Sequence, residues 1–374
     1  MKKPHMLISL LVTFLLITQC AREQAPEQTA SVPAPASPVV NADRTVSFSL
    51  LAPSADSVRV NIVGYSGVIP MSRNENGIWS ATVGPLEPEI WEYSFVVDGV
   101  SMIDPGNSWV DERRLPASSM LEVSGSEPGF YSIQEVPHGV VSVHTFKSSS
   151  LGEMRSFQVY TPPGYDRTKQ DTYPVLYLLH GGGNDERGWT VMGRANYILD
   201  NLIAGGKSLS MIVVMPNGQY PRTSGFGAEA YEKDMLEVII PMVERGYRVK
   251  TESRNRAMAG LSMGGFHTLY IGVKHPELFS WICVLSSGIR DTNERNRYET
   301  EYGEYYDKMN DNLQLLWLGV GDNDTLVKEG YDGLVALLDK RGVKYSSVVY
   351  PGSAHTWDVW RKCLRDFAPL FFRP

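Results

Sequence analysis

The sequence predicts an α/β fold with a mostly parallel sheet, preceded by a small all-β sandwich. After Pro137, apolar runs of strand length alternate with amphipathic stretches of helix length, a pattern typical of a parallel sheet covered by helices on both faces. From about Thr45 to Val123, short alternating runs are separated by turn residues and show no helical period. The 374 residues, 43% hydrophobic and 21% charged, suit one large domain plus a small one.

The individual strands follow from the same patterns. In the N-terminal part, residues 46–50, 58–62 and 91–97 alternate apolar and polar side chains, as in strands that are buried on one face. In the C-terminal part the strands are nearly continuous apolar runs, predicted at residues 173–179, 211–215, 256–259, 281–286, 313–320 and 346–350. Helical stretches lie between them, for example at residues 232–245 and 326–340.

The first residues have the pattern of an export signal. Lys2 and Lys3 precede an apolar run, Met6–Ile17, which has the length of a signal-peptide core and is short for a membrane span. The run leads to Cys20 through a loose bacterial lipobox, although Gln19 replaces the small residue usual before the lipidated Cys. We therefore expect residues 1–19 to be a signal peptide and Cys20 to carry lipid, with cleavage by an ordinary signal peptidase as the alternative.

The next segment, residues 20–42, is rich in Ala, Pro, Glu, Gln and Ser and cannot bury a core, so we expect a flexible tether. The all-β domain is then expected at residues 43–125 and the α/β domain at residues 126–374. With the lipid, the protein would be an outer-membrane or cell-surface lipoprotein; without it, periplasmic or secreted.

A nucleophile motif lies in the α/β part. Gly260-Leu261-Ser262-Met263-Gly264 fits the G-x-S-x-G elbow of α/β-hydrolases, although about 0.3 such matches are expected by chance in a chain like this. The context adds specificity, because a strand-like run precedes the motif and a helix-like run, residues 266–273, follows it. We therefore predict that Ser262 is a nucleophile at a sharp strand-to-helix turn.

A second motif supplies hydrogen-bond donors for a tetrahedral oxyanion. His180-Gly181-Gly182-Gly183 follows a strong predicted strand, which is the position of the oxyanion loop in these enzymes. We predict the backbone N–H groups of Gly182 and Met263 as the oxyanion hole. His180 and Gly181 are candidates for the substrate pocket, and His180 is also interpreted as structural.

The base and the acid are expected after the nucleophile, in the order Ser, acid, His. His355 follows the final predicted strand and is the candidate general base. Asp322 and Asp324 both follow the strand at residues 313–320, and the residue pattern alone does not separate them; Asp291 is a more distant candidate. Trp357 lies close to His355, where helix packing is the default and a place in the acyl pocket the alternative.

From Gly139 onward the chain resembles carbohydrate esterase family 1, which holds feruloyl and acetyl xylan esterases and esterase D-like proteins. The resemblance is carried by Tyr160–Tyr165, Tyr173–Gly183, Met211–Gly218, Gly260–Gly265 and His355–Arg361. In that family the acid closes a G-x-x-D turn, which here is Asp324, so the resemblance favours Asp324 over Asp322. It also implies two-step acyl transfer from a feruloyl or acetyl ester of plant cell-wall polysaccharide, with feruloyl favoured.

The N-terminal part resembles the immunoglobulin-like modules of carbohydrate-binding family 48. Leu51-Ala52-Pro53, Met71-Ser72-Arg73, Gly77–Ser80 and Tyr93–Gly99 carry this resemblance. It implies a carbohydrate-binding type of module, but these motifs describe folding more than binding. Trp79 and Tyr93 are accordingly interpreted as core residues rather than as a sugar platform.

Charge and cysteine content narrow the remaining choices. With 35 Lys and Arg against 42 Asp and Glu the net charge is -7, which does not favour nucleic acid or an anionic membrane as partner. Cys283 and Cys363 have no metal-ligand spacing and are interpreted as buried free thiols, with a disulfide left open. We expect no metal and no cofactor, a polysaccharide or oligosaccharide ester as substrate, and membrane contact only through the lipid on Cys20.

Three other functions stay open at this stage. Siderophore esterases that cleave catecholate trilactones share the layout of a module followed by a hydrolase. A non-catalytic glycan-binding lipoprotein could keep the hydrolase fold, although the intact motifs argue against it. A peptidase is disfavoured because the sequence contains no recognisable propeller or large cap domain.

Overall fold

The structure is a computed structural model, which describes residues 33–65, 67–111, 117–126, 129–221, 227–289, 301 and 303–373. The chain divides into two compact units, Met1–Ala34 and Pro35–Pro374, and the second holds all the elements below. The predicted signal peptide, Cys20 and Asp291 lie outside the described residues, as does the first part of the tether.

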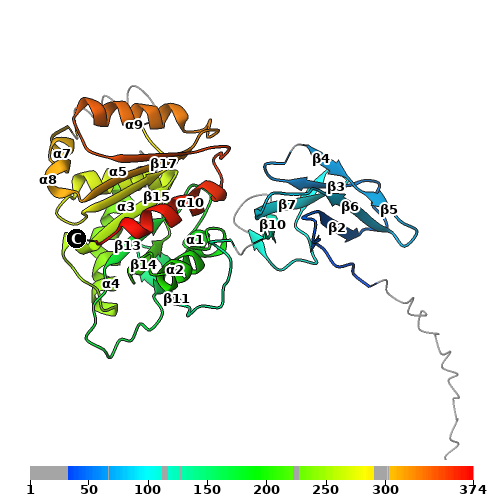
Figure 1. Cartoon of the computed structure of the whole chain (residues 1–374), viewed down its shortest axis with the longest axis horizontal. Coiled ribbons are helices and arrows are strands. Elements are labelled where there is room, and N and C mark those ends of the chain that lie inside the picture. The colour runs from blue at the N-terminus through cyan, green and yellow to red at the C-terminus, as the bar shows by residue number, and fades with distance from the viewer. Residues whose placement is uncertain are drawn as a thin grey trace, which may run out of the picture. The chain divides into compact units, whose positions relative to one another are not determined.

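The N-terminal part of the second unit is all β (Figure 1). Two antiparallel sheets form, with strand orders β1-β2-β6-β5 and β4-β3-β7-β10-β9, and β8 pairs with β7. The strands are β1 (Val39–Val40), β2 (Val46–Leu51), β3 (Val58–Ile62), β4 (Val68–Pro70), β5 (Ser72–Arg73), β6 (Ile78–Val83), β7 (Glu89–Val97), β8 (Val100–Met102), β9 (Val110–Asp111) and β10 (Ser118–Val123).

The core of this part is formed by the alternating apolar residues that the sequence indicated. Along β2, Val46, Phe48 and Leu50 are buried while the residues between them are half-buried. Trp79 and Tyr93 also belong to this core, where Tyr93 is fully buried. Neither presents a sugar platform, as predicted.

The C-terminal part is built on an eight-stranded sheet of order β11-β12-β14-β13-β15-β16-β17-β18. Six of its strands match the predicted runs to within two residues at most ends. The strands are β11 (Val140–Lys147), β12 (Met154–Thr161), β13 (Val175–Leu179), β14 (Ile212–Pro216), β15 (Arg256–Leu261), β16 (Trp281–Leu285), β17 (Leu315–Gly321) and β18 (Ser346–Tyr350).

The sheet is mixed, so the prediction of a mostly parallel sheet holds for one part of it only. The strands from β14 to β18 in this order pair in parallel, but β11 and β12 form an antiparallel hairpin, and β12 joins β14 antiparallel. Strand β11 lies at the edge, and all its residues except the buried Phe146 are exposed or half-buried. Such strands lack the continuous apolar run by which the central strands were recognised.

Helices cover both faces of this sheet (Figure 1). Apolar residues of α1, α2 and α10 form the core on one face, and those of α3, η2, α4, α5 and α9 form the core on the other. The helices are α1 (Gly188–Val191), α2 (Ala195–Ala204), α3 (Ala228–Asp234), π-helix η2 (Met235–Ile239), α4 (Ile240–Gly246), 3₁₀ helix η3 (Ser253–Asn255), α5 (Met263–Lys274), α7 (Gly303–Asp307), α8 (Met309–Asn312), α9 (Lys328–Lys340), α10 (Trp357–Phe367) and 3₁₀ helix η4 (Ala368–Leu370).

A buried carboxylate connects the β11–β12 hairpin to the loop that follows β14. Asp234, at the end of α3, is fully buried and accepts hydrogen bonds from Ser148 Oγ and Tyr220 Oη, both at 2.5 Å. The backbone N–H groups of Ser149 and Ser150 donate to its other oxygen at 2.7 and 3.1 Å. Burial alone would raise the pKa of Asp234, but these hydrogen bonds outweigh it and hold the pKa below its usual value.

We predict that Asp234→Asn lowers the free energy of unfolding by about 2–4 kcal/mol at neutral pH, because buried donors lose a charged acceptor. The folded-state pKa is lower than that of the unfolded chain, so the Asp234 contribution is present above the unfolded value of 3.8 and is lost as the pH falls through the folded value. Urea unfolding between pH 7 and pH 3 should therefore show a shallower acid loss in the variant than in the wild type.

The control is Asp307→Asn, which removes an exposed partner of Arg341 and should change stability by less than about 1 kcal/mol. Equal acid slopes in the wild type and Asp234→Asn would contradict the assignment.

Candidate active site

Ser262 lies in the tight turn between β15 and α5, as its motif predicted. Its backbone has φ +52° and ψ −117°, a conformation that a residue with a side chain adopts only under strain. The turn is closed so tightly that a Cβ on Gly260 would lie 2.2 Å from the carbonyl oxygen of Gly264. The N–H of Ser262 donates to Leu285 O in the next strand at 2.8 Å, which fixes the turn on the sheet.

A chain of hydrogen bonds runs from Ser262 to a buried carboxylate. His355 Nε2 lies 3.0 Å from Ser262 Oγ, and His355 Nδ1 lies 2.9 Å from Asp324 Oδ2. Because Asp324 can only accept when ionised, the Nδ1–H donates to it and Nε2 is left to accept the serine proton. The structure thus brings together the three residues that the sequence singled out.

The acid loop distinguishes the two candidate aspartates. Asp324 is fully buried beside His355, whereas Asp322 is exposed. The loop can reach the histidine loop because residue 321 is glycine: a Cβ there would lie 2.1 Å from Ser353 O. The geometry therefore selects Asp324.

Helix α10, which follows His355, packs against the imidazole ring. The ring of Trp360, on α10, meets the ring of His355 edge to face with 5.1 Å between centroids. Trp357 is buried as well and packs edge to face against Trp360 and Trp189, at 5.1 and 5.3 Å. Trp357 therefore belongs to the helix packing, the default interpretation of the sequence.

Backbone donors lie beside Ser262 on two elements. Met263 is the first residue of α5, so its N–H has no acceptor within the helix and lies at the positive end of the helix dipole. The loop with Gly182 follows β13 and passes the turn closely: a Cβ on Gly181 would lie 3.2 Å from Ser262 Cβ. Both predicted oxyanion donors are thus on segments that adjoin the serine.

The buried side chain of His180 stabilises the loop that carries Gly182. Its side chain is buried, its Nε2 accepts the N–H of Gly218 at 2.8 Å, and its Nδ1 is 2.8 Å from Gly181 O. Since Nε2 is an acceptor here, Nδ1 carries the proton and donates to that carbonyl. His180 ties the loop after β13 to the loop after β14 and so has a structural role.

A cavity of about 290 Å³ opens next to Ser262. Its walls combine apolar side chains with small polar ones and a single carboxylate, and they come mainly from the loops after β16 and β17 and the start of α9. Besides Ser262 and Met263, the lining residues are Phe266, Ser286, Ser287, Gly288, Thr325, Leu326, Val327, Glu329 and Gly330.

None of His180, Gly181 and Trp357, the residues suggested for a substrate pocket, lines this cavity. His180 and Trp357 are buried in loop and helix packing, which explains why they do not reach it. Sequence reasoning missed the lining residues other than Ser262 and Met263, because they carry no motif. Their only signal is that they follow two parallel strands at the edge where Ser262 also lies.

Three further findings concern the cysteines, metal binding and membrane spans. Cys283 and Cys363 are both buried and free, and burial raises the pKa of each thiol well above its usual value. Within the described ranges, no group of three His, Cys, Asp or Glu side chains is arranged to hold a metal ion. No helix in the same part of the chain has the length and apolar character needed to span a bilayer.

Comparisons with known proteins show which proteins this chain resembles. An endo-1,4-beta-xylanase/feruloyl esterase of Xylanibacter ruminicola is 34% identical over 348 residues, which cover 90% of this chain and 46% of that protein. This chain thus spans less than half the length of that relative.

Two solved structures share the fold. The CE1 ferulic acid esterase of Anaeromyces mucronatus superposes with a TM-score of 0.56 and 24% identity over 65% of this chain and 94% of its own. The enterobactin esterase of Shigella flexneri reaches 0.64 with 20% identity, over 87% and 94% of the two chains. An α/β-hydrolase fold with an all-β region before it is therefore present here.

A family model matches as well. Residues 148–370, which include Ser262, Asp324 and His355, fit the Esterase model, described as "Putative esterase". The chain therefore belongs to this esterase family, as its motifs predicted.

Proposed function

We propose that the protein is a serine carboxylic-ester hydrolase that removes acyl groups from plant cell-wall polysaccharide such as xylan. Feruloyl is the favoured acyl group and acetyl the next. The observation that carries the proposal is the hydrogen-bonded chain from Ser262 Oγ through His355 to the buried Asp324, at 3.0 and 2.9 Å.

The proposed reaction has two steps. His355 Nε2 takes the proton of Ser262 while Oγ attacks the ester carbonyl, and Asp324 stabilises the resulting imidazolium. The N–H groups of Gly182 and Met263 hold the oxyanion. The protonated His355 then gives its proton to the departing sugar alcohol, and water, activated by the same histidine, hydrolyses the acyl-enzyme.

The cavity supports a bulky acyl group. At about 290 Å³ it has the volume of roughly ten liquid waters of about 30 Å³ each, far more than an acetyl group fills. Phe266, Leu326 and Val327 offer apolar contacts for an aromatic ring, and Ser286 and Ser287 are close enough to the same space to meet polar substituents. The name of the relative from Xylanibacter ruminicola, which includes feruloyl esterase, supports the same choice.

A siderophore esterase is the second candidate, since the fold match to the enterobactin esterase extends over the all-β region. A catecholate trilactone bound to iron is strongly anionic and calls for basic side chains. Among the described residues that line the cavity, the one charged side chain is the carboxylate of Glu329, which favours an uncharged ester.

We also propose the immunoglobulin-like, carbohydrate-binding type for residues 43–125, on the resemblance of their motifs and the two packed antiparallel sheets. Export, with lipid on Cys20 and the chain before β1 as a tether at the outer membrane or cell surface, is proposed from the sequence alone. The predicted tether, residues 20–42, is too long, because Val39 and Val40 at its end pair with β2 and belong to the all-β part.

The first prediction concerns the nucleophile. Ser262→Ala should fold like the wild type and lower kcat on 4-nitrophenyl acetate by at least about 10⁴-fold, because no acyl-enzyme can form. Stopped-flow release of 4-nitrophenol, with the unfolding temperature as control for the fold, measures this. Retained turnover would remove Ser262 from the mechanism.

The two aspartates of the acid loop give a matched pair. Asp324→Asn should lower kcat by about 10³- to 10⁴-fold, because the amide no longer fixes the imidazole tautomer. Asp322 is exposed to solvent, so Asp322→Asn should leave kcat within about twofold. The reverse order of effects would transfer the acid role to Asp322.

The substrate is tested with feruloylated arabinoxylan beside acetylated xylan, with released ferulate and acetate quantified by chromatography. We expect release of ferulate at a kcat/KM roughly tenfold or more above that for acetate, because the larger group fills the cavity. Faster acetate release would make acetyl xylan the substrate. Hydrolysis of catecholate trilactone alone would support the siderophore alternative, and xylan binding without any hydrolysis would support a non-catalytic lipoprotein.

A further inference from the structure

An arginine on the helix after the catalytic histidine is completely withdrawn from solvent. Arg361, in α10, is 1% exposed. Its Nη1 donates to Met192 O, at the end of α1, at 2.6 Å. Its Nη2 donates to Glu89 Oε1 at 2.7 Å, and Glu89 is the first residue of β7 in the all-β part. A buried guanidinium is unfavourable unless it is paired, so this ion pair fixes the position of α10.

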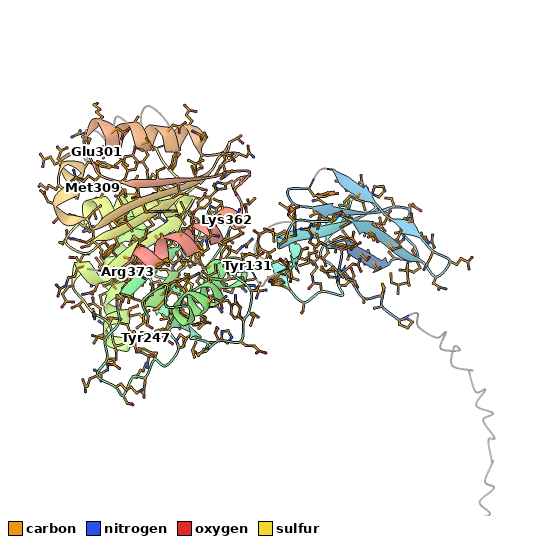
Figure 2. All side chains as sticks on the ribbon, in the orientation of Figure 1. Tyr131, Tyr247, Glu301, Met309, Lys362 and Arg373 are labelled. Carbon is orange, nitrogen blue, oxygen red and sulfur yellow. The ribbon has the colours of Figure 1, made fainter. Side chains whose placement is uncertain are left out.

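The ion pair lies next to a continuous apolar core. Ile90 and Met120 of the all-β strands, together with Tyr131, belong to the same buried cluster as the helices α1, α2 and α10. Tyr131, labelled in Figure 2 like Lys362 of α10, lies with its ring 5.3 Å from the guanidinium carbon of Arg361.

A second arginine makes similar contacts at the start of α2. Arg194 lies over the ring of Trp109 at 4.2 Å and pairs with Glu122 of β10 at 3.8 Å. Its side chain is 13% exposed. Two basic side chains of the α/β part are thus each held by an aromatic ring and a carboxylate of the preceding segments.

A short path of contacts leads from Arg361 to the reacting groups. Arg361 directly follows Trp360, whose ring is in edge-to-face contact with His355. On the other side, Trp360 contacts Trp357, and Trp357 contacts Trp189. Trp189 Nε1 donates to Leu179 O at 3.0 Å, one residue before the loop that carries Gly182.

We propose that Glu89 is a positioning residue for catalysis, acting through Arg361 and Trp360 on His355. The all-β part is then a structural component of the catalytic apparatus, independently of any glycan that it binds. This inference rests on the proposed ester hydrolysis. It assigns to Glu89 no contact with the substrate.

The test is Glu89→Gln in the full chain, which keeps size and hydrogen bonding but removes the charge that holds Arg361. A displacement of the helix by a fraction of an ångström tilts the His355 ring, so we expect kcat to fall by roughly 5- to 50-fold. KM should stay within about twofold, because substrate contacts are unchanged. The rate of inactivation by a small fluorophosphonate, which requires an activated Ser262 but little of the pocket, should fall by the same factor as kcat.

Glu87→Gln is the matched control. Glu87 lies two residues earlier, is 84% exposed in its side chain and pairs at 3.6 Å with Arg44 of the same all-β part. This variant should keep kcat, KM and the inactivation rate of the wild type. Glu89→Asp keeps the charge but shortens the side chain, so the carboxylate lies further from Arg361. This variant should fold and lower kcat by a smaller factor, and it keeps the proposal testable even where Glu89→Gln is poorly folded.

Two results would overturn the proposal. Glu89→Gln and Glu89→Asp with a lower unfolding temperature but unchanged kcat and inactivation rate would leave the ion pair a purely structural role. A rise in KM at constant kcat would instead place Glu89 in substrate binding. Lack of ester turnover in the wild type would refute the proposed function, whereas the fluorophosphonate rates would still test the coupling.

Discussion

The close turn at Ser262 is the constraint on which the rest of the site depends. Glycine at positions 260 and 264 lets the chain fold back on itself where any side chain would collide with backbone. The turn connects a central strand to the helix α5, so the serine is placed at the carboxyl edge of the sheet. Because neighbouring strands are parallel, the loops after β13, β16, β17 and β18 end at that same edge. The oxyanion loop, the cavity walls, the acid and the histidine are therefore all brought to one serine.

Much of this arrangement was predictable from the sequence because it depends on local patterns. The central strands are continuous apolar runs, and Ser262, His180–Gly183 and His355 lie in motifs with a fixed order along the chain. The edge strand β11 and its neighbour β12 were not predicted, because most residues of β11 are exposed or half-buried and β12 changes from exposed to buried along its length. Burial of that kind depends on partners that are distant in sequence.

The choice between Asp322 and Asp324 illustrates the limit of pattern reasoning. Both follow β17 within four residues, and residue types alone do not separate them. In the structure, Asp324 turns inward to His355 and Asp322 turns outward, a difference determined by the path of the loop against Ser353. The ion pair of Glu89 with Arg361 is still further from prediction, since 272 positions separate its partners.

The backbone at Ser262 has a consequence for how such a protein can change over time. Its φ of +52° is held against an intrinsic cost of about 1–3 kcal/mol. Glycine would relieve that strain but remove the hydroxyl, so selection for thermal robustness alone would act against the chemistry at this position. A stable but catalytically inactive descendant of this chain is therefore only one substitution away, Ser262→Gly. If related chains keep serine at this position, the hydroxyl is still under selection for its chemistry.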